Sequence, residues 1–278
     1  MKTINHFPVL DHYEFNPKSA AYLRTERVIK RLICLILTCF GLVSFALAQS
    51  RQVVNQSIQW SFLSSTIKFS PRYSLFTEQQ MGFAEYRNMQ HVFRAGMEYT
   101  AIKKLAIIPF GYAYTWNYIY GKQPATFVNN EHTLWQQIVY KQTISRVALS
   151  HRLRSEERYI QTHSMTANSD VVNNGFNNRQ FRLRYRAQVN IPLNRKKIEP
   201  KTFFLSLWDE IFMSWGRVVT YHKPDQNRLF TGVGYQFTKS LTMQTGFYYQ
   251  MLVKSNGLRQ ENNTGLLFQL NYNFDLSK

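Results

Sequence analysis

Cysteine is almost absent from the 278-residue chain: the only two, Cys34 and Cys39, lie in one apolar run near the N-terminus. If that run is removed, no thiol remains, and disulfides and thiolate chemistry are excluded from the mature fold. Beyond residue 48 there is also no hydrophobic run long enough for a helix that crosses the inner membrane. The sequence therefore indicates neither a disulfide-stabilised or thiol-dependent protein nor a helical protein of the inner membrane.

Acidic residues are scarce too, with 16 against 34 basic ones, and the formal net charge is +18. In a soluble protein this charge would suggest a nucleic-acid partner. Aromatic residues, however, make up 15% of the chain. Basic charge and many aromatics together suit a membrane barrel with an aromatic-rich outside and a polar lumen.

Residues 32–47 form the strongly apolar run, and its length suits the core of a secretory signal better than a spanning helix. The run ends in Ala46-Leu47-Ala48, the small-x-small pattern that signal peptidase cuts. We therefore predict cleavage after Ala48. Residues 1–48 would be an N-terminal extension with a signal peptide, and residues 49–278 one exported barrel domain.

The first 27 residues are polar and of mixed charge, which is unusual for a signal. The segment Val28-Ile29-Lys30-Arg31 would make a conventional short basic region before the apolar run. One hypothesis is therefore that translation starts at a non-ATG codon for Val28. The alternative is a long basic region that starts at Met1.

The segment from Phe181 to Leu193 alternates strictly between apolar and polar side chains. Because successive side chains of a strand point to opposite faces, one face is apolar and the other carries Arg182, Arg184 and Arg186. A helix would scatter the same residues around its circumference. Similar segments follow one another to the C-terminus. The sequence thus predicts an all-β fold, an antiparallel transmembrane up-and-down β-barrel of the outer membrane, with apolar side chains facing lipid.

The alternation recurs in eleven stretches, whereas bacterial single-chain barrels usually have an even number of strands. If both termini are periplasmic, the first stretch is partial or has an unseen partner, so ten strands are favoured and twelve are the alternative. Short and long links alternate, which predicts short periplasmic turns, long external loops and a periplasmic C-terminus. The stretches are residues 57–62, 67–77, 89–99, 108–120, 133–142, 147–159, 181–193, 202–213, 228–237, 241–251 and 265–274.

The rule that apolar side chains face lipid assigns a face to every residue of these stretches. In the first stretch it turns Ile58, Trp60 and Phe62 outward and the alternating Ser and Gln residues inward. In the fourth it turns Ile108 outward together with the six aromatic residues of the same parity that follow, up to Tyr120. Tyrosine and tryptophan at the end of that stretch are typical of an interfacial girdle.

The polar parity places eleven charged side chains in the lumen. The arginines of stretches 147–159 and 181–193 would face one another across adjacent strands, where like charges repel. Glu156 and Glu210 are therefore expected as their partners, and the planar arginine fork suits such pairing. The predicted lumen residues are Arg94, Glu98, Arg152, Arg154, Glu156, Arg158, Arg182, Arg184, Arg186, Glu210 and Arg228.

This lumen has two interpretations. A narrow barrel fills its interior with side chains, and the polar network simply satisfies itself. Alternatively, rings of arginine select anions, which predicts a porin-like passive channel or a binding site for small anionic solutes such as uronic-acid oligosaccharides. The excess of arginine favours the pore, and the small strand number favours the filled interior. In the alternative function, a non-conducting barrel uses its long external loops, residues 161–178 above all, to contact an unknown protein partner.

No catalytic residue, cofactor or metal site is expected. No nucleophile lies at a recognisable spacing from the histidines, and Ser150 and His151 face opposite sides of one strand. Neither metal-ligand spacing nor a phosphate-binding glycine loop is present. A nucleic-acid surface is excluded because stacking platforms need arginine and aromatics on one face. The weak candidates for an outer-membrane hydrolase are His163 with Asp170 and His222 with Asp225.

Four motifs together carry a family resemblance. They are residues 151–159 (HRLRSEERY), 182–186 (RLRYR), 209–212 (DEIF) and 226–235 (QNRLFTGVGY). In this order they resemble an uncharacterised family of exported Gram-negative outer-membrane barrels, common in Bacteroidetes and classed as a domain of unknown function. The likeness covers the chain from about Trp60 to Phe274. It implies a location and a fold, and it implies no chemistry because the family has no established activity.

Overall fold

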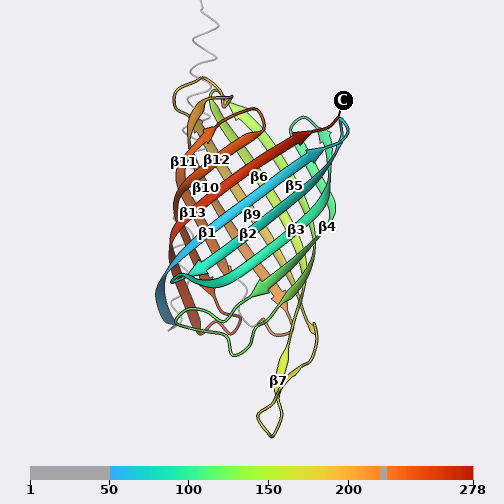
Figure 1. Ribbon diagram of the computed structural model, residues 1–278, viewed down its shortest axis with the longest axis vertical. Coiled ribbons are helices and arrows are strands. Elements are labelled where there is room, and N and C mark those ends of the chain that lie inside the picture. The colour runs from blue at the N-terminus through green and yellow to red at the C-terminus, as the bar shows by residue number, and fades with distance from the viewer. Residues whose placement is uncertain (1–50, 220–223, 278) are drawn as a thin grey trace, which may run out of the picture. The chain divides into compact units, whose positions relative to one another are not determined.

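A computed structural model describes residues 51–219 and 224–277, so the predicted signal segment lies outside the described residues. These residues form thirteen strands and no helix. Eleven of the strands close a barrel, and β7 (His163–Met165) and β8 (Val171–Asn173) form a separate hairpin (Figure 1). The predicted all-β closed barrel is confirmed. No helix in the described part of the chain is long and apolar enough to cross a membrane, a finding that does not bear on strands.

The barrel strands follow one another around the wall in chain order, and sequential neighbours pair antiparallel. β6 pairs directly with β9 because the β7–β8 hairpin lies within the link between them. The barrel strands are β1 (Gln52–Lys68), β2 (Tyr73–Ala84), β3 (Arg87–Ile102), β4 (Leu105–Asn117), β5 (Glu131–Ile144), β6 (Val147–Ile160), β9 (Asn178–Pro192), β10 (Thr202–Gly216), β11 (Gln226–Gln236), β12 (Leu241–Val253) and β13 (Arg259–Asp275).

The barrel closes through a parallel pair, β1 with β13, from Gln52 opposite Arg259 to Lys68 opposite Asp275. The prediction of ten strands, with twelve as the alternative, was therefore wrong: the described residues form eleven. An even count is required only when every neighbouring pair is antiparallel. A parallel pair also satisfies the backbone hydrogen bonds of both edges, and it lets an odd number of strands close.

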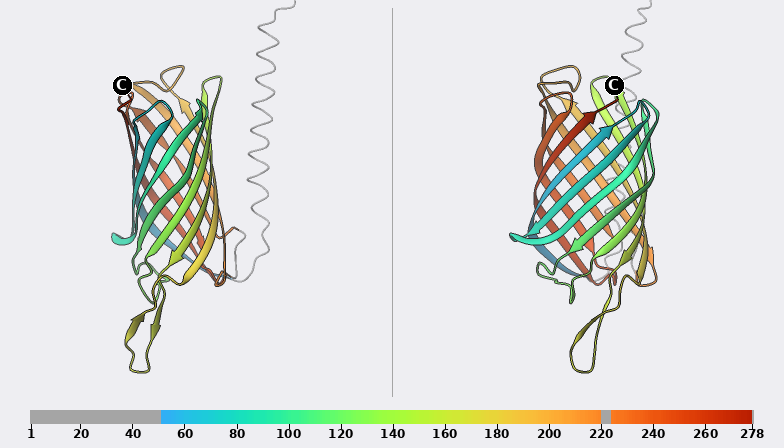
Figure 2. Two further views of the ribbon diagram at one scale, coloured as in Figure 1. Left: turned by 90° about the vertical axis from the view of Figure 1, so that its right-hand side faces the viewer. Right: turned by 45° about the vertical axis from the view of Figure 1, so that its right-hand side comes forward.

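The ends of the barrel differ in their links, as the spacing predicted. At the end where the C-terminus lies, the links are short, and the longest is residues 193–201. At the opposite end two links are longer, residues 118–130 and 161–177, and residues 217–225 equal residues 193–201 in length. The loop expected over residues 255–262 is shorter than predicted, because β13 begins at Arg259 and leaves only residues 254–258. Figures 1 and 2 show the β7–β8 hairpin projecting from this long-loop end. Because the strand number is odd, β1 begins at the long-loop end while β13 ends at the short-link end.

The side-chain alternation is regular, but three assignments of faces were wrong. Tyr120, which follows β4 and was expected outside, packs against buried apolar residues inside the barrel. Ile58, Trp60 and Phe62 point inward and are only 0%, 3% and 8% exposed, so the polar parity of β1 faces outward. Ile108 is also buried inside, because the pairing of β4 with β5 shifts register between Ile108 and Gly111. Alternation separates two faces of a strand, and it does not say which face is inside.

The inward residues of β1 belong to an apolar cluster in the lumen. The cluster joins them to aromatic residues of β10, β11 and β12 on the same side of the barrel. Trp208 stacks on Phe230 with ring centroids 5.6 Å apart, and its edge meets Tyr248 at 5.9 Å. We call this set the apolar cluster; it comprises Ile58, Trp60, Phe62, Ala84, Met89, Trp208, Phe230, Tyr248 and Leu267.

Candidate functional site

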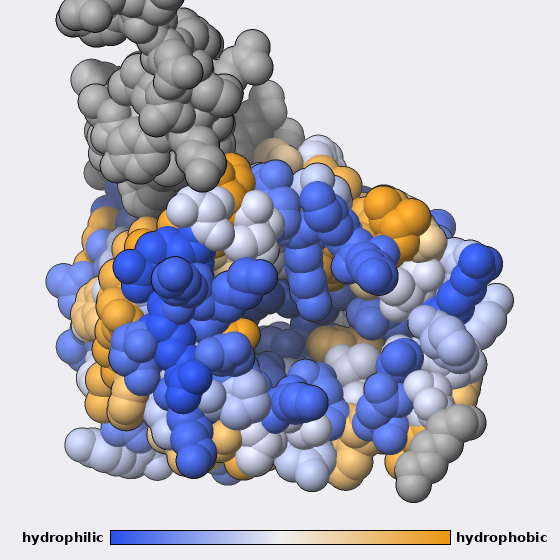
Figure 3. Space-filling view, turned by 90° about the horizontal axis from the view of Figure 1, so that it is seen from above, coloured by the Kyte–Doolittle hydropathy of each residue, from blue (hydrophilic) through white to orange (hydrophobic). Residues whose placement is uncertain are grey.

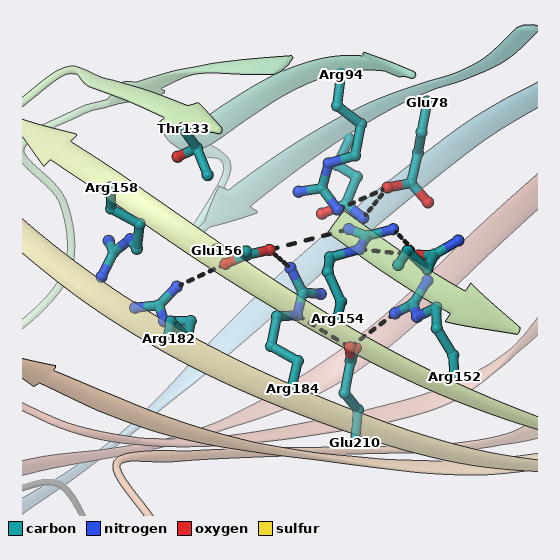
Figure 4. Close-up of polar contacts among 12 residues, drawn as sticks. Glu78, Arg94, Thr133, Arg152, Arg154, Glu156, Arg158, Arg182, Arg184 and Glu210 are labelled. Carbon is teal, nitrogen blue, oxygen red and sulfur yellow. Dashed lines mark hydrogen bonds and ion pairs between the residues drawn. The ribbon is translucent and has the colours of Figure 1, made fainter. Parts of the chain in front are cut away.

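Charged side chains cross the lumen in one layer, which we call the central plug. They project inward from β2, β3, β5, β6, β9 and β10 (Figure 4), whereas most of the apolar cluster comes from β1 and from β10 to β13. Arg154 and Arg184 are only 1% and 4% exposed. The plug comprises Glu78, Arg94, Glu131, Arg152, Arg154, Glu156, Arg158, Arg182, Arg184 and Glu210.

Two carboxylates neutralise arginines that the strand register brings face to face. Arg154 of β6 lies directly opposite Arg184 of β9. Glu156 accepts from Arg184 Nη1 at 2.6 Å, and Glu210 accepts from Arg184 Nε at 3.0 Å and from Arg152 Nη2 at 2.7 Å. Arg184 therefore bridges both carboxylates, as Figure 4 shows. These are the partners that repulsion between like charges required.

Two further carboxylates of the plug were missed by the sequence analysis. Glu78 of β2 lies opposite Arg94 of β3, with 3.0 Å between Glu78 Oε1 and Arg94 Nη1. Glu131 accepts from Arg158 Nε at 2.7 Å and from Arg158 Nη2 at 2.5 Å. Each glutamate lies one or two residues outside the strand limits that we predicted. Extending the alternation to the next inward position is the signal that would have found them.

Amides and aromatic rings hold the arginines that carboxylates do not fully neutralise. Arg154 donates from Nε and Nη2 to Gln137 Oε1 at 2.9 and 2.6 Å, and its guanidinium lies 4.6 Å from the centre of the Trp135 ring. Arg228 lies 5.3 Å from the Trp60 ring and 5.0 Å from the Phe212 ring. Ring faces carry negative partial charge, so they stabilise a desolvated guanidinium.

The link 118–130 lies over the apolar cluster at the long-loop end. Tyr120 packs against the cluster, and its hydroxyl donates to Glu261 at 3.1 Å. Lys254 Nζ lies 2.5 Å from the same carboxylate. Burial and the neighbouring Glu261 carboxylate raise the pKa of Tyr120. The link also donates to the carbonyl groups of Gln52 and Asn55 on β1. The long-loop end is thus covered on this side.

A cavity of about 920 Å³, which we call the vestibule, reaches from the short-link end to the central plug. Figure 3 looks onto this end and shows mostly hydrophilic residues around a hollow centre, with hydrophobic residues towards the outside. Most of the polar lining is neutral amide and hydroxyl. The charged lining is predominantly basic and comprises Glu78, Glu98, Lys103, Lys104, Lys141, Arg152 and Arg186.

Arg186 is the distinctive residue of the vestibule. Arg152 and Glu78, which also line it, are held in ion pairs of the plug. Arg186 makes no ion pair within the described residues, and its guanidinium lies 5.6 Å from the centre of the Trp208 ring. Glu210 lies opposite Arg186 across the pairing of β9 with β10, but it is held by Arg152 and Arg184. A half-buried arginine that makes no ion pair of its own, at the inner end of the vestibule, is suited to bind an anion.

The structure places all eleven predicted lumen residues on the inner face. Glu98 and Arg186 line the vestibule, and Arg152 lines it as well as the plug. Arg228 lies beside the plug against Trp60 and Phe212. The other seven are buried in the plug itself or line the small cavity within it: Arg94, Arg154, Glu156, Arg158, Arg182, Arg184 and Glu210.

The weak hydrolase candidates do not come together in the described residues. No hydrogen bond or ion pair joins His163 to Asp170; the His163 ring instead lies 5.3 Å from the Phe127 ring. His222 lies outside the described residues. Ser150 lines the vestibule, whereas Nδ1 of His151 lies 2.8 Å from the hydroxyl of Tyr185 on the outer face. The described residues hold no cluster that would ligate a metal ion.

Comparison with known proteins gives one match. A family model described as "Protein of unknown function (DUF2490)" matches residues 58–262. No curated protein matches the chain, and no solved structure matches it. The matched range includes every strand of the central plug and the four motifs of the sequence analysis.

Proposed function

The chain belongs to the DUF2490 family of proteins of unknown function, as its motifs predicted, and we propose that it is an outer-membrane barrel that binds small anionic solutes without conducting them. One observation carries this proposal. The plug and the apolar cluster fill the lumen together, while the vestibule stays open and Arg186 at its inner end makes no ion pair.

The outer surface supports a membrane location. Large apolar side chains such as Phe110 and Leu266, both 62% exposed, cover the outside, while most charges of the strands lie inside. Asp209 and the Glu157–Arg179 pair are charges on the outer face. Aromatic residues gather towards both ends of the wall, for example Tyr114 with Trp116 and Tyr272 with Phe274. This distribution is typical of transmembrane barrels with two aromatic girdles. By the usual topology of short periplasmic links, the vestibule opens to the periplasm.

The packing of the plug favours binding over conduction. From the sequence alone, the excess of arginine favoured an anion-selective pore. Arg154 and Arg184 are almost fully buried, however, and each is tied to residues of a neighbouring strand. An anion that crossed the barrel would have to break these contacts and expose unpaired buried charges, which is costly.

The vestibule offers the chemistry that an anion requires. The short links that surround its mouth hold nine basic residues against one acidic residue, Glu199, so their field concentrates anions there. Arg186 supplies a planar fork for a carboxylate or a phosphate. Neutral amides of the wall, such as Gln188 and Gln244, are within the same lining and bind the remaining polar groups.

The first prediction concerns conduction and binding together. The refolded protein is expected to show no conductance steps in a planar bilayer. It is expected to bind citrate in calorimetry, and Arg186→Gln is expected to weaken that binding at least tenfold, the equivalent of about 1.4 kcal/mol for one charged contact. Arg179→Gln, on the outer face at the long-loop end, is the matched control and is expected to bind normally.

Two outcomes would contradict the proposal. Stable conductance of the wild-type protein, with a reversal potential set by a salt gradient, would show that the barrel is an anion-selective pore. Citrate binding that is unchanged in Arg186→Gln would remove the vestibule as its site.

A second candidate function rests on the β7–β8 hairpin. Met165 and Val171 are 60% and 56% exposed on a two-stranded sheet that projects beyond the barrel (Figure 2). Exposed apolar side chains beside unpaired strand edges are suited to a protein partner. This hairpin carries the alternative in which external loops contact another protein.

A second prediction separates the hairpin from the barrel. Replacing residues 163–173 by a short Gly-Ser turn is expected to change the free energy of unfolding by less than about 1 kcal/mol, because the hairpin pairs with no barrel strand. Denaturant unfolding of the refolded protein measures this. A larger loss would show that the hairpin is part of the barrel fold and not a separate contact element.

A further inference from the structure

A second cavity, of about 40 Å³, lies inside the plug and is separate from the vestibule. Five arginines line it, and Glu131 and Glu156 are the acidic side chains of its lining. The volume has room for a particle of the size of one water molecule or a small ion. The arginines are Arg94, Arg158, Arg182, Arg184 and Arg228.

The charges around this cavity do not balance. The carboxylates that pair with its arginines are shared with the rest of the plug, so the charges are counted over the whole network. With Arg228 and with Asp225, a further buried carboxylate that interacts with Arg158 and Arg182, the plug holds seven arginines against five carboxylates, which leaves two positive charges in excess. Arginine stays protonated in proteins, so it does not remove the excess by losing a proton. Buried charges without counter-charges are strongly disfavoured. An anion bound in the cavity would supply a counter-charge for this excess.

Buried hydrogen-bond donors around the cavity are also without partners. Nε of Arg94 and Nη2 of Arg184 are inaccessible to solvent and have no acceptor within the described residues. Three of the four neutral polar side chains of the lining already donate elsewhere: Thr133 to Glu131, Gln80 to Glu78 and Gln90 to Asn117. A group bound in the cavity thus finds arginine N–H groups that have no other acceptor.

We infer that the plug binds one small monovalent anion, such as chloride, in this cavity. A water molecule would satisfy the free donors but would leave the excess charge in place, whereas an anion does both. The anion lies between β3, β6 and β9 and links arginines of all three strands. This inference does not depend on the membrane location or on binding in the vestibule.

Bromide is the probe for a direct test. Crystals of the full barrel grown or soaked in sodium bromide are expected to show an anomalous peak inside the cavity, bordered by Arg158, Arg182 and Arg184. Density for water alone at this position, or bromide confined to the vestibule and the surface, would overturn the inference.

A solution test uses the same ion. The unfolding temperature is expected to rise saturably with bromide, by about 5–10 °C at a hundredfold excess over the Kd, relative to isethionate at equal ionic strength. Arg182→Gln is expected to abolish the rise. Arg179→Gln, exposed and outside the plug, is expected to keep it.

Ala113→Val keeps the test decisive if Arg182→Gln does not fold. Ala113 is buried and lines the cavity, so the added methyl groups occupy the space of the anion and leave every arginine in place. This variant is expected to lose the difference between bromide and isethionate. Equal unfolding temperatures of the wild-type protein in the two salts, or a full bromide effect in Ala113→Val, would contradict the assignment.

Discussion

Replacing Glu210 by glutamine is expected to lower the free energy of unfolding by about 3–5 kcal/mol. Glu210 is almost fully buried and accepts from both Arg152 and Arg184. Glutamine has nearly the same shape but no charge, so both guanidinium groups lose a counter-charge that buried water does not replace. Denaturant unfolding of the protein refolded into lipid vesicles, followed by tryptophan fluorescence, measures the change.

A surface ion pair supplies the control for this prediction. Glu157 pairs with Arg179, whose side chain is 57% exposed, so Glu157→Gln is expected to cost less than about 1 kcal/mol. The combination of Glu210→Gln with Arg152→Gln is expected to cost less than the sum of the two single changes, because the residues are partners. A Glu210→Gln variant as stable as Glu157→Gln would show that the plug does not hold the barrel together.

The second large effect is expected at the closing seam. Gly265 of β13 lies opposite Ile58 of β1, and a Cβ at this position would lie only 1.6 Å from the carbonyl oxygen of Ile58. That oxygen belongs to the backbone and does not move without separating the strands. Gly265→Ala is therefore expected to lower the free energy of unfolding by more than about 4 kcal/mol or to prevent closure of the barrel. Single substitutions reach effects of this size by only a few mechanisms, which include overpacking and conflict with the backbone.

Thr264→Ala is the matched control, because the neighbouring side chain is exposed on the outside of the same seam. It is expected to fold as the wild-type protein does. The folded fraction after refolding into vesicles, together with the free energy of unfolding, compares the two variants. If Gly265→Ala folded with wild-type stability, β1 and β13 would not meet in this register, and the eleven-strand closure would be wrong.

The plug and the vestibule give the lumen two separate tasks. The plug holds β6, β9 and β10 together through Arg184, which binds Glu156 and Glu210 at once. In the vestibule, Arg186, the next inward residue of β9, makes no ion pair, and Glu210 opposite it is bound by Arg152 and Arg184. The same alternation of arginines thus serves stability at one position and, in our proposal, anion binding at the next.

The sequence alone predicted the features that depend on neighbours along the chain. Period-two alternation identified β9 and turned Arg182, Arg184 and Arg186 to one side, because successive strand residues point to opposite faces. Link lengths separated the two ends of the barrel. Local parity also placed the eleven charged residues on the inner face, although Glu78 and Glu131 escaped because they lie just beyond the predicted strand limits.

Contacts between strands that are distant in the sequence decided the rest. The parallel pairing of β1 with β13 fixed an odd strand number, and packing against Trp208 and Tyr248 turned the apolar face of β1 inward. A register shift beside Gly111 did the same for Ile108. Whether the arginines surround a pore or fill the lumen depends on how far they reach across it. Alternation carries no information on that distance, because closure and register are properties of the whole sheet.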